Sequence, residues 1–196
     1  RLPQDGRITL RLAGRAVEDA VMWLLREHQQ GRPHDAREAY EQKARPRLNG
    51  GWKESRSGAW REDPKHCVCL HEHYYHTWTP DEEKSAAADT AAQVKRCLDH
   101  FMERTLPRLA GISLLDEIEV SVPGGGGDAE NVQIEDVKVY AIPDYVYRAG
   151  DGLVIVDWKS GRPRPGHRDQ LAVYGLWAVR RHGAQPDRVV LTLEYL

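Results

Sequence analysis

Two carboxylates and a lysine lie close together in the sequence, at Asp144 and in the triplet Asp157-Trp158-Lys159. The triplet ends an apolar, β-branched run at 153–156 that follows the turn residues Gly150-Asp151-Gly152, and this pattern predicts a buried strand in a hairpin. Because strand side chains alternate, Asp157 and Lys159 are expected on one face. Charge at the end of a buried strand is costly unless it is paired or binds a metal, so these residues predict a divalent-metal site.

The chemistry expected of this site is phosphoryl-group chemistry. Asp144 is predicted to approach Asp157 across the hairpin, and two such carboxylates repel unless a cation or a proton lies between them. Oxygen ligands of this kind suit Mg²⁺ or Mn²⁺, which polarise a phosphoryl oxygen and lower the pKa of a bound water. We expect Lys159 to position that water or to neutralise charge on the phosphate. The side chain of Trp158 is predicted to point away, and its backbone carbonyl is a candidate further ligand.

A basic loop and a helix follow the predicted strand. Four side chains of this loop are candidates for contact with a DNA backbone: Arg162, Arg164, His167 and Arg168. The alternative is a solvated Pro/Gly turn with ordinary surface charge. Gln170 and Tyr174 are four residues apart, which places them on one face of the helix predicted over residues 168–182.

In this order, Asp144, Asp157-Trp158-Lys159, Gln170 and Tyr174 resemble the PD-(D/E)XK nuclease superfamily, and in particular its RecB-like branch. That branch includes helicase-linked nucleases and CRISPR-adaptation exonucleases. The resemblance implies a restriction-endonuclease-like core and a deoxyribonuclease that depends on Mg²⁺ or Mn²⁺. It also implies that these five polar side chains form the catalytic site, with DNA as substrate and a helicase or other domain in the same or a partner chain. Residues 141–144, Ala-Ile-Pro-Asp, lack the glycine of the branch's Gly-x-x-Asp pattern but keep the acid.

Two further acids are candidates for the metal site. Residues 14–18, Gly-Arg-Ala-Val-Glu, resemble the first motif of the branch, Gly-x-x-Val-His, with Glu18 in the position of the histidine. The resemblance implies that Glu18 approaches the metal; the alternative is an acid near a helix N-terminus, where the helix dipole favours it. Glu119 is a weaker candidate, because alternation also fits a solvent-facing position on a strand.

These residues must be positioned by a mixture of helices and strands. Periodicity and capping signals predict helices over 12–28, 35–43, 79–106 and 168–182, with Pro46 and Pro107 after the ends of the second and third. Strands are predicted over 117–122, 137–146, 153–159 and 188–196. Residues 46–78 are basic and aromatic with glycine breaks, and we expect an irregular insertion there. The order predicts an α+β (α/β-like) fold, with a mixed central β-sheet flanked by helices, in one domain over residues 1–196.

Composition limits the class of protein. The 196 residues carry a formal net charge of −2, so an anionic partner must meet a local basic patch. Without an apolar run of membrane-spanning length or a signal-peptide pattern, a cytoplasmic location is expected. Three irregularly spaced cysteines fit a reducing compartment. The sequence lacks an initial Met and ends in a predicted strand, so we expect a fragment of a longer chain.

The segment 66–76 contains two cysteines and four histidines, which are possible zinc ligands, although Cys-x-Cys spacing does not match a zinc knuckle. Trp52, Trp60 and Trp78 lie near basic residues and are candidates for stacking on unpaired bases, with core packing as the alternative. Two alternatives to a nuclease stay open from the sequence. One is a degenerate nuclease fold that binds nucleic acid or a protein, and the other is a zinc-stabilised interaction module.

Overall fold

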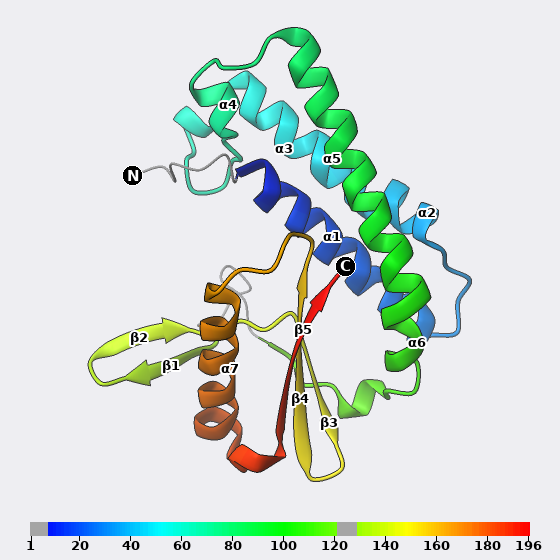
Figure 1. The fold of residues 1–196 in the computed structure, drawn as a ribbon, viewed down its shortest axis with the longest axis vertical. Coiled ribbons are helices and arrows are strands. Elements are labelled where there is room, and N and C mark those ends of the chain that lie inside the picture. Colours follow the sequence, from blue (N-terminus) through cyan, green and yellow to red (C-terminus); the bar gives the residue numbers. More distant parts are fainter. Residues whose placement is uncertain (1–7, 121–128) are drawn as a thin grey trace. The chain divides into compact units, whose positions relative to one another are not determined.

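The computed structural model describes residues 8–120 and 129–196 (Figure 1). The chain divides into two compact units, Arg1–Ala110 with Leu196 and Gly111–Tyr195, and each is described by itself. The first unit is helical and the second carries the central sheet, so the predicted α+β class is confirmed. The prediction of one domain over residues 1–196 is not tested by this division. None of the described helices combines the length and the apolar composition of a membrane span.

Helix α1 (Ile8–Gln29) is the centre of the helical unit and confirms the predicted first helix. Its buried positions recur at helical spacing from Leu12 to Leu25, and it packs against both α3 (Arg45–Ser57) and α5 (Pro80–His100). Burial on two sides explains why its apolar stripe is broad. Small side chains contribute to that stripe, since Ala13, Ala16 and Ala20 are all buried.

The predicted end of the second helix before Pro46 is wrong. Helix α2 (Ala36–Ala39) runs through a π turn at Tyr40–Ala44 directly into α3. At this turn the Arg45 N–H bonds to the Tyr40 carbonyl, five residues back, and Pro46 then occupies the first turn of α3. Pro46 has no N–H to donate to the preceding turn, and the π turn directly before α3 is the kind of local irregularity that accompanies such a break in the helical ladder.

The expectation of irregular structure over residues 46–78 is wrong for most of its first half. Helix α3 continues through Asn49-Gly50-Gly51, and a short helix α4 (His71–Tyr74) follows further on. A Cβ at Gly51 would lie 2.6 Å from Leu12 Cδ1, so the glycine allows α3 to approach α1 closely. The glycine that suggested a break therefore serves helix packing.

Helix α5 begins where the sequence predicts, with a capping box in which Thr79 bonds to the Glu82 N–H and Glu82 bonds back to the Thr79 N–H. The predicted end before Pro107 is wrong. A π turn at Phe101–Thr105 leads into α6 (Leu106–Leu109), and Pro107 lies in the first turn of that helix. Both misplaced helix ends therefore have the same cause, a π turn that ends two residues before a proline.

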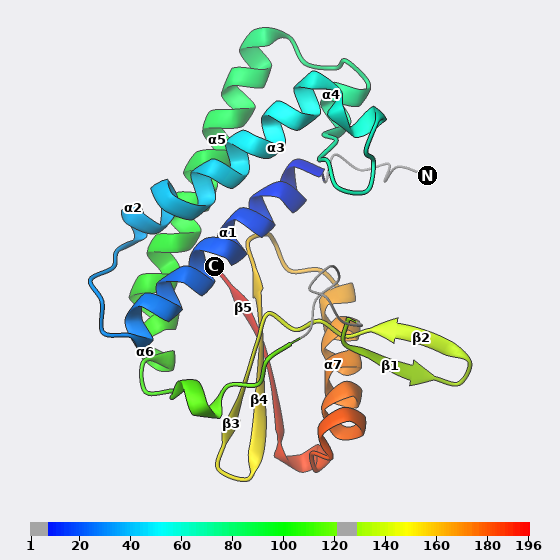
Figure 2. The ribbon, with the colours of Figure 1, turned by 180° about the vertical axis from the view of Figure 1, so that it is seen from behind.

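The second unit contains a three-stranded mixed sheet in the order β3-β4-β5. Strand β4 (Gly152–Lys159) pairs antiparallel with β3 (Tyr145–Ala149) and parallel with β5 (Val189–Tyr195). Helix α7 (Gly166–His182) connects β4 to β5 and lies along the sheet (Figure 2). Strand β4, α7 and β5 match the sequence predictions closely, and both strands are rich in β-branched and apolar residues.

The strand predicted over 137–146 is divided in two. Strands β1 (Asn131–Ile134) and β2 (Val137–Tyr140) form a separate hairpin, and the chain then passes through Pro143 before β3 begins at Tyr145. Asp144 therefore lies in a bend before β3 rather than on a strand. The strand predicted over 117–122 is represented among its described residues by a single bridge between Glu117 and Tyr147, and residues 121 and 122 lie outside the described part.

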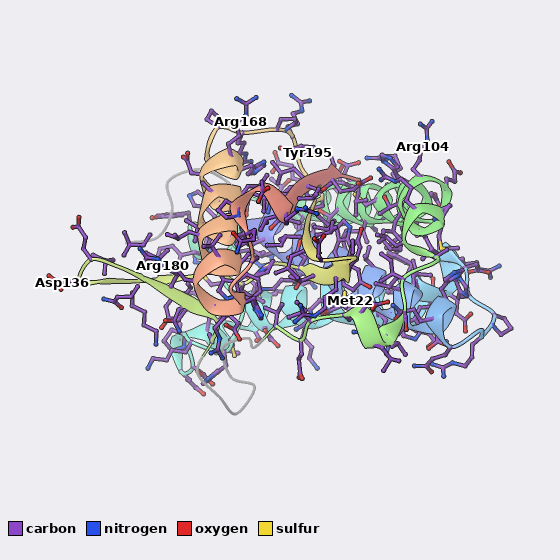
Figure 3. The ribbon with its side chains drawn as sticks, turned by 90° about the horizontal axis from the view of Figure 1, so that it is seen from below. Met22, Arg104, Asp136, Arg168, Arg180 and Tyr195 are labelled. Carbon is purple, nitrogen blue, oxygen red and sulfur yellow. The ribbon has the colours of Figure 1, made fainter. Side chains whose placement is uncertain are left out.

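The core of this second unit lies between α7 and the two sheets. Trp177 is fully buried there, beside Val132 of β1 and Ile155 of β4. Figure 3 shows the β1–β2 hairpin extending from α7 with Asp136 at its tip, and Arg180 of α7 bonds to the carbonyl of Gln133 on β1. This packing fixes the inward face of α7, on which Tyr174 also lies.

Candidate active site

Strand β4 delivers Asp157 and Lys159 to one face of the sheet. Asp157 is buried, with 1% of its surface exposed, and the Lys159 ammonium forms an ion pair with its Oδ2 atom. Trp158 lies on the opposite face, where its ring stacks on Tyr145 with 5.9 Å between ring centroids. The acid and the lysine are therefore neighbours, as the alternation of strand side chains predicts.

Asp144 reaches the end of β4 from the bend before β3. Its Oδ2 atom accepts a hydrogen bond of 2.7 Å from the backbone N–H of Trp158, the residue after Asp157. In an extended strand the N–H and C=O of one residue leave on the same side. The Trp158 carbonyl is thus directed to the side on which Asp144 lies, and its role as a metal ligand stays a prediction.

Tyr174 and Gln170 on α7 complete this group. The Tyr174 hydroxyl accepts a bond of 2.6 Å from Gln170 Nε2, and its single proton faces two acceptors, Ile142 O at 2.9 Å and Asp157 Oδ1 at 3.2 Å. Burial raises the pKa of Tyr174 far above its ordinary value, and the negative charges of Asp157 and Asp144 raise it further. The hydroxyl therefore stays protonated at neutral pH and acts as a donor.

The remaining oxygen of Asp157 is the atom that suits a cation. Asp157 Oδ2 is buried, and among the described residues the cation that it faces is the Lys159 ammonium, with which it forms an ion pair. No group of three or more His, Cys, Asp or Glu side chains forms a metal site within residues 8–120 and 129–196. Mg²⁺ is commonly held by only one or two carboxylates together with water and substrate phosphate, so Asp144 and Asp157 fit such an ion.

Three residues of the basic loop after β4 that are predicted to contact DNA are exposed to solvent. Arg162, Arg164 and Arg168 form no ion pair with any other described residue, and Figure 3 shows Arg168 pointing outward at the start of α7. His167 differs, because it is half-buried and its Nδ1 lies 2.8 Å from the Tyr195 hydroxyl. Burial, and then the positive charge of Lys159, lower the pKa of His167.

The two further acids belong to different compact units, Glu18 to the helical unit and Glu119 to the sheet-bearing unit. Glu18 lies exposed on α1 in the helical unit, where it lines a groove together with Arg15 and Arg47. Its predicted approach to the metal stays a prediction. Glu119 is also exposed, two residues after the bridge to β3, which agrees with the solvent-facing alternative.

The Cys-His segment has a structural role in the helical unit. Both ring nitrogens of His73 are engaged, with Nδ1 2.8 Å from Ser55 Oγ and Nε2 3.0 Å from Glu83 Oε1. His66 faces Asp63 at 2.8 Å. Residues 66–76 are all described and contribute to no group of three zinc-ligand side chains. The geometry therefore gives no support to the zinc-stabilised module.

Sequence reasoning missed two partners of the site. The Ile142 carbonyl, which accepts from Tyr174, carries no signal in the sequence because it is a backbone atom. Tyr195, the partner of His167, could have been found from strand pairing. In the parallel β4–β5 pair its register partner is Lys159, and this register places both residues at the same end of the sheet.

A comparison with protein-family models matches residues 14–196 to a family described as the PD-(D/E)XK nuclease superfamily. The matched region includes every polar residue of the group around Asp157. The α+β architecture is consistent with a restriction-endonuclease-like fold. Neither a curated protein nor a solved structure matches the chain.

Proposed function

Because the chain belongs to the PD-(D/E)XK nuclease superfamily, we propose that it is a metal-dependent deoxyribonuclease that hydrolyses phosphodiester bonds of DNA. The observation that carries this proposal is the group at the end of β4, where the buried Asp157 carboxylate forms an ion pair with Lys159 and Asp144 accepts a hydrogen bond from the Trp158 N–H. Buried charge is costly unless it is paired, and two carboxylates at one strand end beside a lysine suit a divalent cation and a phosphate. The Gln170–Tyr174 pair, four residues apart on α7, supports assignment to the RecB-like branch.

In this proposal Asp144 and Asp157 hold Mg²⁺ or Mn²⁺, and the Trp158 carbonyl and Glu18 are candidate further ligands. The bound ion would polarise a phosphoryl oxygen and lower the pKa of a water. Lys159, whose ammonium already lies at Asp157, would stabilise negative charge that develops on the phosphate. Tyr174 stays protonated and orients Asp157, while Gln170 orients Tyr174.

The substrate contact is proposed for the loop that follows β4. Arg162, Arg164 and Arg168 are exposed, and guanidinium groups suit phosphate oxygens. His167 lies at the inner end of this loop, against Tyr195. A helicase or another domain, in the same or a partner chain, is proposed as the source of additional DNA contacts.

The test is cleavage of end-labelled single-stranded and double-stranded DNA in Mg²⁺, Mn²⁺ or EDTA. Wild type is compared with Asp157→Ala and Lys159→Ala, and with Lys138→Ala on the exposed surface of β2 as a control. We expect cleavage that requires metal, is lost in both site variants and is unchanged in the control. Undiminished cleavage by both site variants would refute the assignment. If a folded wild type cleaves none of the substrates, the binding-module alternative is favoured instead.

A further inference from the structure

A groove on the helical unit has a composition that the proposed active site does not explain. It lies between α3 and α5 and has a cavity volume of about 690 Å³. Its apolar floor includes Leu48 and the small side chains Ala87 and Ala91. Pockets of a few hundred cubic ångströms are the size that holds small organic ligands. The groove lies wholly within residues 40–91, so one compact unit forms it.

An aromatic ring is held in a fixed orientation at this groove. Trp52 lines it, and the ring stacks on Trp78 with 5.5 Å between centroids and 6° between planes. The Trp52 indole N–H donates to Glu83 Oε1 at 2.9 Å, and His73 packs edge-on against the ring at 6.1 Å. With one face covered and its N–H bonded, the ring is pre-organised, and its remaining surface is available to a ligand in the groove.

The charge of the groove is positive, although the whole chain is slightly acidic. Lys53, Arg56 and Lys84 line it, and Glu83 is its one acid. The Glu83 Oε1 atom already accepts bonds from Trp52, His73 and Arg56. Burial alone would raise the Glu83 pKa, but these bonds lower it, so the carboxylate is ionised and internally neutralised. Lys53 and Lys84 are exposed and form no ion pair with other described residues.

An aromatic face flanked by unpaired cations is the chemistry that recognises an unpaired base and its phosphates. A duplex does not offer free base faces, so the combination favours a single strand. Resting on the proposed deoxyribonuclease function, we infer that the groove between α3 and α5 binds a single-stranded segment of the DNA substrate. Trp52 contacts a base there, and Lys53 and Lys84 contact phosphates.

The test measures binding rather than cleavage. Asp157→Ala protein in EDTA is titrated with fluorescein-labelled oligothymidylate of about 16 nucleotides, the upper end of known site sizes. A DNA duplex of equal total charge is titrated in parallel. The groove variant carries Lys53→Glu and Lys84→Glu. The control carries Arg37→Glu and Arg104→Glu, two exposed sites away from the groove lining that give the same change in net charge (Arg104 is labelled in Figure 3).

We expect the groove variant to bind oligothymidylate at least tenfold more weakly, with the control and the duplex affinities within about threefold of the parent. The slope of log K against log salt should fall by about 1.4 in magnitude, because each lost phosphate contact on a single strand contributes about 0.7. Unchanged oligothymidylate affinity in the groove variant would overturn the inference. So would equal weakening by both double variants or on both ligands, because that result reports overall charge.

The inference and the proposed function can fail separately. If the wild type cleaves duplex DNA in the presence of metal but the groove variant binds oligothymidylate normally, the nuclease function is supported and the groove is not its single-strand site. If the wild type cleaves no substrate but the groove variant selectively loses single-strand binding, the groove is supported as a binding site and the nuclease function is not. Circular dichroism of each variant checks that the helical unit is folded.

Discussion

Replacing Tyr174 with phenylalanine removes one hydroxyl from the centre of the sheet-bearing unit and little else. Tyr174 is 2% exposed, so water cannot replace the lost group. The hydroxyl accepts from Gln170 at 2.6 Å and donates to Ile142 O or Asp157 Oδ1. We therefore expect the variant to lose stability as well as proper orientation of Asp157.

The magnitude follows from the number of bonds lost. Two bonds lost at about 1 kcal/mol each, with buried partners left unsatisfied, give a loss of about 2–3 kcal/mol in the free energy of unfolding. For a chain of this size that corresponds to a fall in Tm of about 4–12 °C.

The assay is urea unfolding followed by tryptophan fluorescence, to which the buried Trp177 of the same core contributes. The matched control is Tyr140→Phe on β2, which is 58% exposed and should change the free energy of unfolding by less than about 0.5 kcal/mol. A Tyr174→Phe protein within about 0.5 kcal/mol of wild type would refute the claim that this hydroxyl is buried and bonded at both ends.

Three further outcomes follow from the same structure. The pKa of tyrosine is about 10 in the unfolded chain and is raised in the folded protein. At pH values between these two, ionisation in the unfolded chain should lower the free energy of unfolding of the wild type by about 1.4 kcal/mol per pH unit. Tyr174→Phe should therefore show a shallower alkaline slope in unfolding titrations. Because folding lowers the pKa of His167, its contribution to the free energy of unfolding is present above about pH 6.5 and is lost as pH falls. In His167→Gln, the free energy of unfolding should therefore fall less steeply on the acid side. Gly152→Ala should lower the free energy of unfolding by about 1–3 kcal/mol, since its Cβ would collide with the Arg188 carbonyl. Gly166→Ala, which has open space around it, should be neutral. Equal Tm values for the two variants in thermal unfolding would contradict this packing.

Much of the site was predictable because local periodicity determines it. Period-two alternation places Asp157 and Lys159 together on β4, and the four-residue helical spacing places Gln170 below Tyr174 on α7. The bond between Asp144 and the Trp158 N–H depends instead on where the chain bends after Pro143. A proline in an apolar stretch signalled that bend, but the strong pattern on both sides of it suggested one continuous strand.

The helical unit was less predictable because tertiary packing overrides local signals there. Gly51 lies inside α3 since a larger side chain would collide with Leu12 of α1, a contact that is distant in sequence. The bonds that converge on Glu83 of α5 likewise come from two other helices, α3 and α4. Periodicity within one segment contains no information about such partners, so the groove beside Trp52 could not be located from the sequence.

The π turn at Tyr40–Ala44 sets the rotational phase of α3. A π turn contains one residue more than the α-helical repeat, and one residue corresponds to about 100° of rotation about the helix axis. Deleting one residue from this turn, with Pro46 replaced by alanine, would restore an unbroken α-helix and rotate the face that carries Gly51 and Ser55 by that angle. Gly51 would then leave Leu12, and Trp52 would leave Glu83. This combined change would thus act as a rotation of α3 rather than as a loss of one side chain.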